Sequence, residues 1–155
     1  MREPILVSAC LLGLRTRYDG TTKRNAAVLA WLEQQHLLPI PVCPEQLAGL
    51  PTPREQTRFA SGDGQALLAG NGEIVAVATG QSMNEHFLRG ARETCHIARL
   101  TGCRRALLKE RSPSCGVHQI HRGTEMVAGV GVTTALLLAA GITVQSETDL
   151  PAGGS

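Results

Sequence analysis

The chain has 155 residues, a formal net charge of +2 at pH 7 and 43% hydrophobic residues. This length is typical of one domain of roughly 100–200 residues, and the apolar content excludes a disordered chain. The small net charge gives no sign of a nucleic-acid or membrane surface, and an aromatic content of 3% leaves few groups for stacking on single-stranded nucleic acid. We expect a single domain over 1–155, with a core over about 4–150 and a frayed tail over 151–155.

The first half of the chain combines two predicted strands with one predicted helix. Asn25 can cap the helix, which carries an apolar stripe. Because Pro39 and Pro41 cannot donate to a ladder, we expect the second strand at or near a sheet edge. The predicted elements in chain order are a buried strand over 5–9, a polar loop over 13–23, a helix over 26–36, a strand over 38–42 and a long loop from 43 to about 71.

The second half continues the alternation of strands and helices. Ser82 and Glu85 have the spacing of a capping box, and Gly102 and Gly141 are typical helix stop signals. The predicted elements are a strand over 74–78, a helix over 83–100, a strand over 105–109, an extended piece over 117–121 with a turn at 122–123, a helix over 131–140 and a strand over 142–146.

This alternation predicts a single-domain α/β fold. We expect a three-layer, open, mostly parallel and Rossmann-like sheet of about five strands with flanking helices. Ligands of such sheets bind at the carboxyl ends of the strands, where the chain order reverses. Residues at those ends are therefore the first candidates for a functional site.

Three cysteines fall at predicted strand ends. Cys10 ends the first strand, Cys43 ends the second, and Cys115 lies in the loop after the fourth. We therefore expect their thiols to gather at one edge of the sheet. The other two, Cys95 within a predicted helix and Cys103 before a strand, are expected to be buried small apolar residues.

The neighbours of the three cysteines favour a reactive site over three buried, inert thiols, which is the plainer alternative. The neighbouring residues are Glu45 beside Cys43, Ser112 and Ser114 beside Cys115, and the cations Lys109 and Arg111. The positive charge of the two cations would favour a thiolate.

Several chemistries suit three convergent thiols. They can hold a zinc ion with an open position, an iron–sulfur cluster with one free iron, or no metal, as in a redox thiol enzyme. The chain has no Cys-x-x-Cys pair, which weakens zinc, whereas an open iron would bind a soft atom such as sulfur.

Weaker signals lie around these cysteines. Gly129-Val130-Gly131 before a helix is either a tight turn or a backbone site for an anion. His118 and His121 are expected to be exposed polar residues rather than ligands. Arg17 and Asp19 lie in the loop over 13–23 that follows Cys10, within reach of the same crevice.

The motifs together resemble a small bacterial family long catalogued as a domain of unknown function. Its better-understood members are thiouracil desulfurases (desulfidases) that depend on a [4Fe–4S] cluster. The resemblance covers roughly residues 4–150. The segments that carry it are SACLLG at 8–13, RYDG at 17–20, PVCPEQL at 41–47, GLPTPR at 49–54, GDG at 62–64, KERSPSCG at 109–116 and GVGVTTA at 129–135.

The resemblance implies a cluster held by Cys10, Cys43 and Cys115, with the fourth iron open to the substrate's sulfur. It implies Glu45 and Ser112 as the acid/base groups. The sequence departs from the family pattern at 116–119, where small residues and a lysine are common, and this alters the expected pocket wall. Further candidate substrate contacts are Ser8, Asp19, Arg111 and Ser114.

The resulting hypothesis is a cytoplasmic desulfurase that converts a thiolated heterocycle such as 2-thiouracil to uracil and sulfide without net redox change. The absence of a membrane-spanning stretch or signal-peptide layout supports the cytoplasmic location. In that reducing compartment the five cysteines are not expected to form a disulfide framework. We expect a monomer or weak homodimer that binds neither nucleic acid nor membrane stably. The alternatives are a sulfur carrier in tRNA thiolation, a zinc hydrolase, and a metal-free ligand-binding or stress module.

Overall fold

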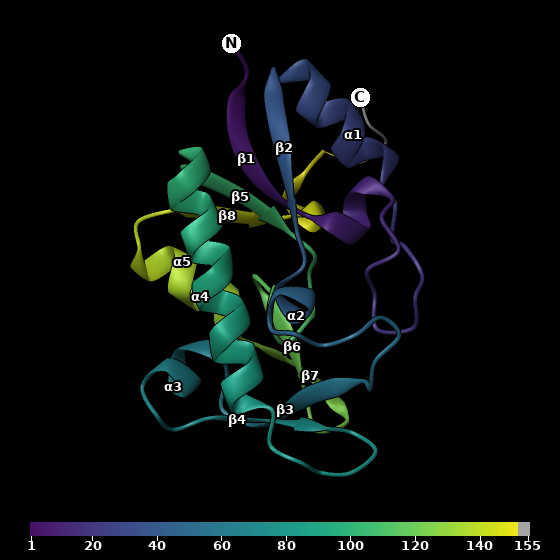
Figure 1. The fold of residues 1–155 in the computed structure, drawn as a ribbon, viewed down its shortest axis with the longest axis vertical. Coiled ribbons are helices and arrows are strands. Elements are labelled where there is room, and N and C mark those ends of the chain that lie inside the picture. Colours follow the sequence, from purple (N-terminus) through teal and green to yellow (C-terminus); the bar gives the residue numbers. More distant parts are fainter. Residues whose placement is uncertain (152–155) are drawn as a thin grey trace.

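A computed structural model describes residues 1–151, which form two four-stranded sheets connected and covered by helices (Figure 1). The predicted tail lies outside the described residues except for Pro151. No helix within the described part of the chain is long and apolar enough to cross a membrane.

The first sheet is entirely parallel and confirms the predicted α/β class. Its interior strands carry fully buried apolar residues, including Leu6 and Leu107, which are 0% exposed. The strand that contains Pro39 and Pro41 lies at the edge, as predicted, because the missing N–H groups would interrupt a ladder on a second side. The four strands, in order across the sheet, are β2 (Leu37–Val42), β1 (Glu3–Ser8), β5 (Arg105–Leu108) and β8 (Thr143–Ser146).

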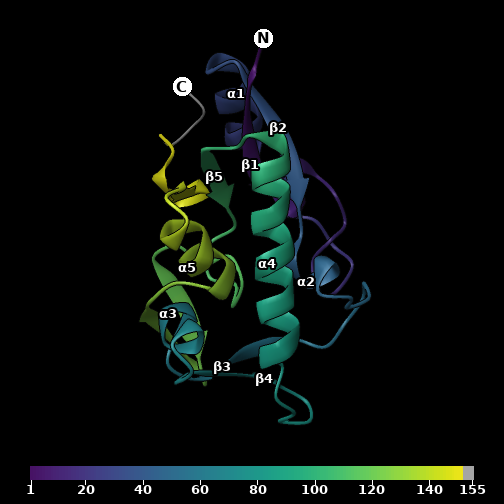
Figure 2. The same cartoon turned by 60° about the vertical axis from the view of Figure 1, so that its left-hand side comes forward.

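Helices cover both faces of this sheet. Along β1, Ile5 and Val7 join the apolar cluster beneath the first helix, whereas Leu6 joins the cluster beneath the other two. This alternation follows the two-residue period of a strand. Figure 2 shows the longest helix running from the first sheet toward the second. The helices are α1 (Ala26–Gln34) on one face, and α4 (Asn84–Thr101) and α5 (Val132–Ala139) on the other.

The second sheet was only partly predicted. Its centre is the parallel pairing of Phe59 with Arg122, flanked by two antiparallel pairs. The predicted strand over 74–78 joins this sheet rather than the parallel one, and the extended piece over 117–121 is the first strand of a hairpin. The strands, in order, are β4 (Glu73–Ala76), β3 (Thr57–Ser61), β6 (Gln119–Arg122) and β7 (Glu125–Ala128).

The prediction of a long loop from Cys43 to about Asn71 was wrong. This stretch contains β3 and two short helices, which are too short to show a helical period in the sequence. In β3 only Phe59 is buried, so the strand shows no alternating pattern of its own. The two helices are α2 (Pro44–Leu47) and α3 (Gly64–Leu68).

The two predicted helix caps differ in outcome. The Asn25 side chain caps α1 by accepting the N–H of Val28 at 3.1 Å, as predicted. The capping box at Ser82 and Glu85 does not form, and α4 starts at Asn84 without a side-chain cap. The Asn84 side chain instead accepts the N–H of Ile74 at 2.8 Å and so ties the helix to β4. A tertiary contact has replaced the local one.

Candidate functional site at the strand ends

A cavity of about 320 Å³ opens at the carboxyl ends of β1, β2 and β5. Cys10, Cys43 and Cys115 all line it, so the structure brings together three thiols that are far apart in the sequence. Cys10 and Cys115 are 8% and 4% exposed, and no cysteine among the described residues is in a disulfide.

Short turns place the first two cysteines. Cys10 lies in a 3₁₀ turn, η1 (Ala9–Leu12), that follows β1 directly and ends at Gly13, whose φ of 101° favours glycine. The carbonyl of Cys10 accepts the N–H of Lys23 at 3.0 Å, which folds the loop over 13–23 back across the site. Cys43 follows the last residue of β2, Val42, and is the N-cap residue of α2, which starts at Pro44.

The loop that carries Cys115 is held by the N-terminus of α5. Gly131 lies so close to this loop that a Cβ would collide with the carbonyl group of Ser114. Of the two alternatives for 129–131, the anion site is not available, because the free N–H groups of the helix bind loop carbonyls instead. The bonds run from Gly131 N to Gly116 O at 2.8 Å, from Val132 N to Pro113 O at 2.9 Å, from Thr133 N to Ser114 O at 2.9 Å and from Thr134 Oγ1 to Cys115 O at 3.0 Å.

Glu110, which the sequence analysis did not single out, holds the same loop from the other side. It is 4% exposed, and its Oε1 accepts the N–H groups of Val117 at 2.7 Å, His118 at 2.8 Å and Gln119 at 3.1 Å. Burial disfavours the charged carboxylate, but these donors outweigh it and hold the pKa of Glu110 below its ordinary value. Its position in a polar turn suggested exposure, and no local signal marked it as buried.

Glu45 connects the loops of two cysteines. Its Oε1 accepts the hydroxyl of Ser114 at 2.7 Å, and its Oε2 lies 3.8 Å from the Cys43 sulfur. Ser114 lies 3.1 Å from the hydroxyl of Ser112, which in turn accepts the N–H of Cys115 at 2.8 Å. Glu45, Ser114 and Ser112 therefore form one hydrogen-bonded chain along the cavity.

Cations surround the thiols but do not make them acidic. Arg54 donates to the carbonyl of Thr16 at 2.7 Å and lies 3.8 Å from the Cys43 sulfur, while Lys109 pairs with Glu147 at 2.9 Å. Burial raises the pKa of Cys10 to about 11, and the positive charge of Lys109 offsets this only in part. The nearby cations do lower the pKa of this thiol, in the expected direction, but the effect of desolvation is larger.

Burial also raises the pKa of Cys43 and of Cys115, and the negative charge of Glu45 acts in the same direction on both. Without a metal, all three groups are thiols at neutral pH. A soft cation bound among them would reverse this balance, because a coordinating thiol loses its proton.

The donor set suits a cluster. Within residues 1–151, no three His, Cys, Asp or Glu side chains are close enough to hold one metal ion. A [4Fe–4S] cluster makes a different demand, because each cysteine binds an iron of its own and the sulfurs lie spaced around the cluster. Three thiols that face one cavity from three loops, those of Cys10 and Cys115 buried and that of Cys43 partly buried, fit this requirement.

The remaining candidate residues divide into two groups. Ser8 lines the cavity and accepts the N–H of Lys109 at 2.8 Å, and Arg111 also lines it. Ser114 is 1% exposed and lies behind the lining. Asp19 lies outside the lining as well, and its carboxylate accepts the N–H of Thr21 at 3.1 Å.

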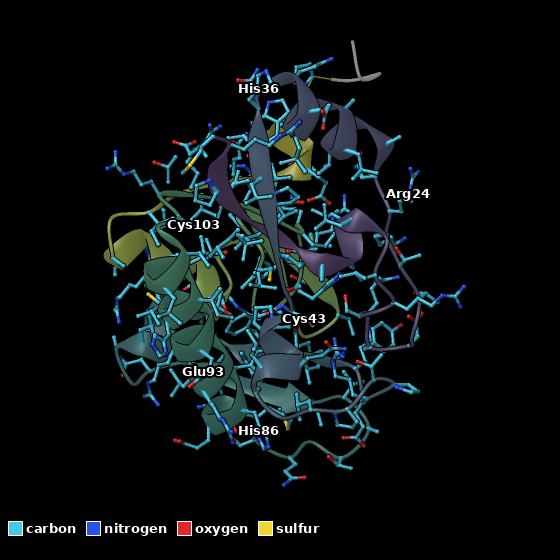
Figure 3. The ribbon with its side chains drawn as sticks, turned by 45° about the horizontal axis from the view of Figure 1, so that its top comes forward. Arg24, His36, Cys43, His86, Glu93 and Cys103 are labelled. Atoms are coloured by element: carbon cyan, nitrogen blue, oxygen red, sulfur yellow. The ribbon has the colours of Figure 1, made fainter. Side chains whose placement is uncertain are left out.

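The other residues named from the sequence lie mostly away from the thiols. His118 pairs with Asp149 at 2.9 Å, and His121 is exposed but borders the cavity. Cys95 and Cys103 are buried in the apolar cluster beneath α4, as expected. Figure 3 shows Cys103 apart from Cys43, near the end of α4.

Comparisons with known proteins found a matching family and two similar proteins. A family model described as 2-thiouracil desulfurase matches residues 5–149. A Bacillus subtilis (strain 168) protein, described as uncharacterized protein YbbK, is 38% identical over 149 residues, or 94% of this chain and 97% of the relative. A solved structure described as [4Fe-4S]-dependent thiouracil desulfidase TudS is 40% identical, with a TM-score of 0.81, over 97% of this chain and 94% of that chain.

Proposed function

The chain belongs to the 2-thiouracil desulfurase family, and on that premise we propose that it removes sulfur from a thiolated heterocycle such as 2-thiouracil. The observation that carries the proposal is the convergence of Cys10, Cys43 and Cys115 on one cavity beside Glu45. The cavity volume of about 320 Å³ lies at the lower end of the range for small-molecule sites, which suits a single six-membered ring.

We propose that the three cysteines hold a [4Fe–4S] cluster, the group named for the similar desulfidase. When bound, the iron without a cysteine ligand supplies a Lewis acid that attracts the soft sulfur of a thiocarbonyl. Glu110 and the N-terminus of α5 keep the loop of Cys115 in place for this ligation, through the hydrogen bonds described above.

The net reaction exchanges sulfur for oxygen. Water forms a bond to the thiocarbonyl carbon, the carbon–sulfur bond breaks, and the products are a carbonyl and hydrogen sulfide. No electrons are gained or lost, so the reaction needs no oxidant or reductant. The protein must therefore orient the water and manage its protons.

The proposed general base is Glu45, which would take a proton from the water. Its Oε1 is fixed by the Ser114 hydroxyl at 2.7 Å, which leaves Oε2 directed toward the thiols, 3.8 Å from the Cys43 sulfur. The hydroxyl of Ser112, which lines the cavity, connects to Glu45 through Ser114 and can pass a proton between the substrate and the carboxylate.

The decisive experiment measures iron and acid-labile sulfide in protein purified without oxygen, together with desulfuration of 2-thiouracil. We expect about four of each per chain and release of sulfide. A variant with Cys10→Ala, Cys43→Ala and Cys115→Ala should lose the iron, whereas Cys95→Ala, a buried cysteine outside the cavity, should retain it. Iron-free wild-type protein, or iron that persists in the triple variant, would overturn the cluster assignment. Loaded protein that leaves 2-thiouracil and related thiolated rings intact would overturn the activity.

A further inference from the structure

The cavity contains an aromatic side chain that the proposed chemistry does not use. The chain has one Trp, one Tyr and two Phe. Phe59 and Phe87 are buried in the cluster between the second sheet and α4, and Trp31 lies on α1 and packs against the apolar cluster beneath that helix. Tyr18 is the aromatic residue that lines the cavity, in the loop that folds back over Cys10.

Tyr18 is held in place by the backbone and by a neighbouring cation. Its carbonyl accepts the N–H of Arg54 at 2.7 Å, which fixes it beside the loop that reaches Cys43. The guanidinium carbon of Arg17 lies 5.8 Å from the centre of the Tyr18 ring, within the range of a cation–π contact. Arg17 lines the cavity too, so the pair shares this cavity with the three thiols.

These contacts leave the ring with an unused surface. Tyr18 is only partly buried, and neither a hydrogen bond of its hydroxyl nor an apolar cluster within residues 1–151 accounts for its side chain. An aromatic ring held at the wall of a small cavity offers a face for a second flat ring. Stacking of this kind accepts any planar π-system and excludes puckered ones.

We propose that Tyr18, with Arg17 against its ring, forms a stacking wall that selects planar aromatic thio-heterocycles. This inference rests on the proposed function and adds the residue that recognises the ring. Tyr18 takes no part in bond making or proton transfer. It acts on the affinity for the substrate, so its loss should raise KM and leave kcat unchanged.

The test compares 2-thiouracil with 5,6-dihydro-2-thiouracil, whose ring is saturated and puckered. Loss of one stacked base costs about 1–3 kcal/mol, so Tyr18→Leu should raise KM for 2-thiouracil by roughly tenfold. KM for the dihydro compound should change much less. Tyr18→Phe keeps the ring and should behave like the wild type for both. Equal effects of Tyr18→Leu on the two substrates, or a loss confined to kcat, would overturn the proposal.

A binding measurement separates this inference from the proposed activity. Calorimetric titration of the loaded protein with uracil and with dihydrouracil needs no turnover. The wild type and Tyr18→Phe should bind uracil more tightly than dihydrouracil, and Tyr18→Leu should lose that preference. If the preference depends on Tyr18 but no thiolated ring is desulfurated, the stacking wall stands and the activity fails. If desulfuration proceeds and Tyr18→Leu retains the preference, the stacking wall fails and the activity stands.

Discussion

The buried carboxylate of Glu110 should be a major contributor to stability, although it takes no part in the proposed chemistry. Its Oε1 accepts three backbone N–H groups at 2.7, 2.8 and 3.1 Å, and the N–H of Arg111 lies at 3.3 Å. A hydrogen bond to a charged group contributes about 1.5–3 kcal/mol, and a buried donor left without a partner costs a similar amount. Since bonds that share one acceptor are not additive, we expect Glu110→Ala to lower the free energy of unfolding by about 3–5 kcal/mol.

Glu110→Gln separates the charge from the shape. It keeps an acceptor at Oε1 but loses the negative charge, and neutral hydrogen bonds are about half as strong, so the expected loss is roughly 1–2 kcal/mol. Glu93→Gln, an exposed carboxylate on α4 that is labelled in Figure 3, is the matched control and should change stability by less than ~0.5 kcal/mol.

The assay is urea unfolding at pH 7 combined with hydrogen exchange of the amides over 117–119. Exchange there should speed up in Glu110→Ala while the amides of β1 remain protected. The pH dependence gives a second check. Because the folded pKa of Glu110 lies below its ordinary value, its stabilisation is present above about pH 4.3 and is lost as the pH falls through the folded value. A Glu110→Ala protein within ~1 kcal/mol of the wild type, with unchanged exchange over 117–119, would refute this account.

Three further predictions concern the cavity. Glu45→Gln should lower kcat by about 10²–10⁴-fold and leave the iron content unchanged, as measured by sulfide release and iron assay; full activity would exclude Glu45 as the base. Gly131→Ala should displace the loop of Cys115 and reduce both the melting temperature and the iron retained, whereas Thr134→Val, which removes one hydrogen bond, should have a smaller effect; equal iron in both variants would contradict the close packing at Gly131. In iron-free protein, the alkylation rate of Cys10 should rise with pH toward a midpoint near its raised pKa of about 11, followed by mass spectrometry; a midpoint near that of an exposed thiol would show that burial does not control it.

The sequence predicted the features that depend on short-range patterns and strand order. Parallel pairing of β1, β2 and β5 necessarily brings their carboxyl ends to one edge, so the positions of Cys10 and Cys43 immediately after strands sufficed to predict their approach. The edge position of β2 was predictable from Pro39 and Pro41 alone, because proline has no N–H to donate to a second neighbouring strand.

The features that escaped prediction depend on contacts distant in the chain. The strand β3 exists because Phe59 pairs with Ile74 and Arg122, neither of which is adjacent in sequence. The capping box at Ser82 lost to the bond between Asn84 and Ile74. The 129–131 segment has a sequence that suits a tight turn or an anion site, but the loop carbonyls occupy its donors, and sequence alone does not show which partner reaches them.

The docking of α5 against the loop of Cys115 has a consequence for biosynthesis. The thiols of Cys10 and Cys43 leave the ribosome long before Val132–Ala139, which must be present to hold the third cysteine in place. At about 5–20 residues per second, the gap lasts on the order of several seconds. During this interval the nascent chain presents the thiols of Cys10 and Cys43 without a third cysteine held in place beside them. We therefore expect cluster delivery to be a post-translational event, which waits for the final third of the polypeptide to be made and folded.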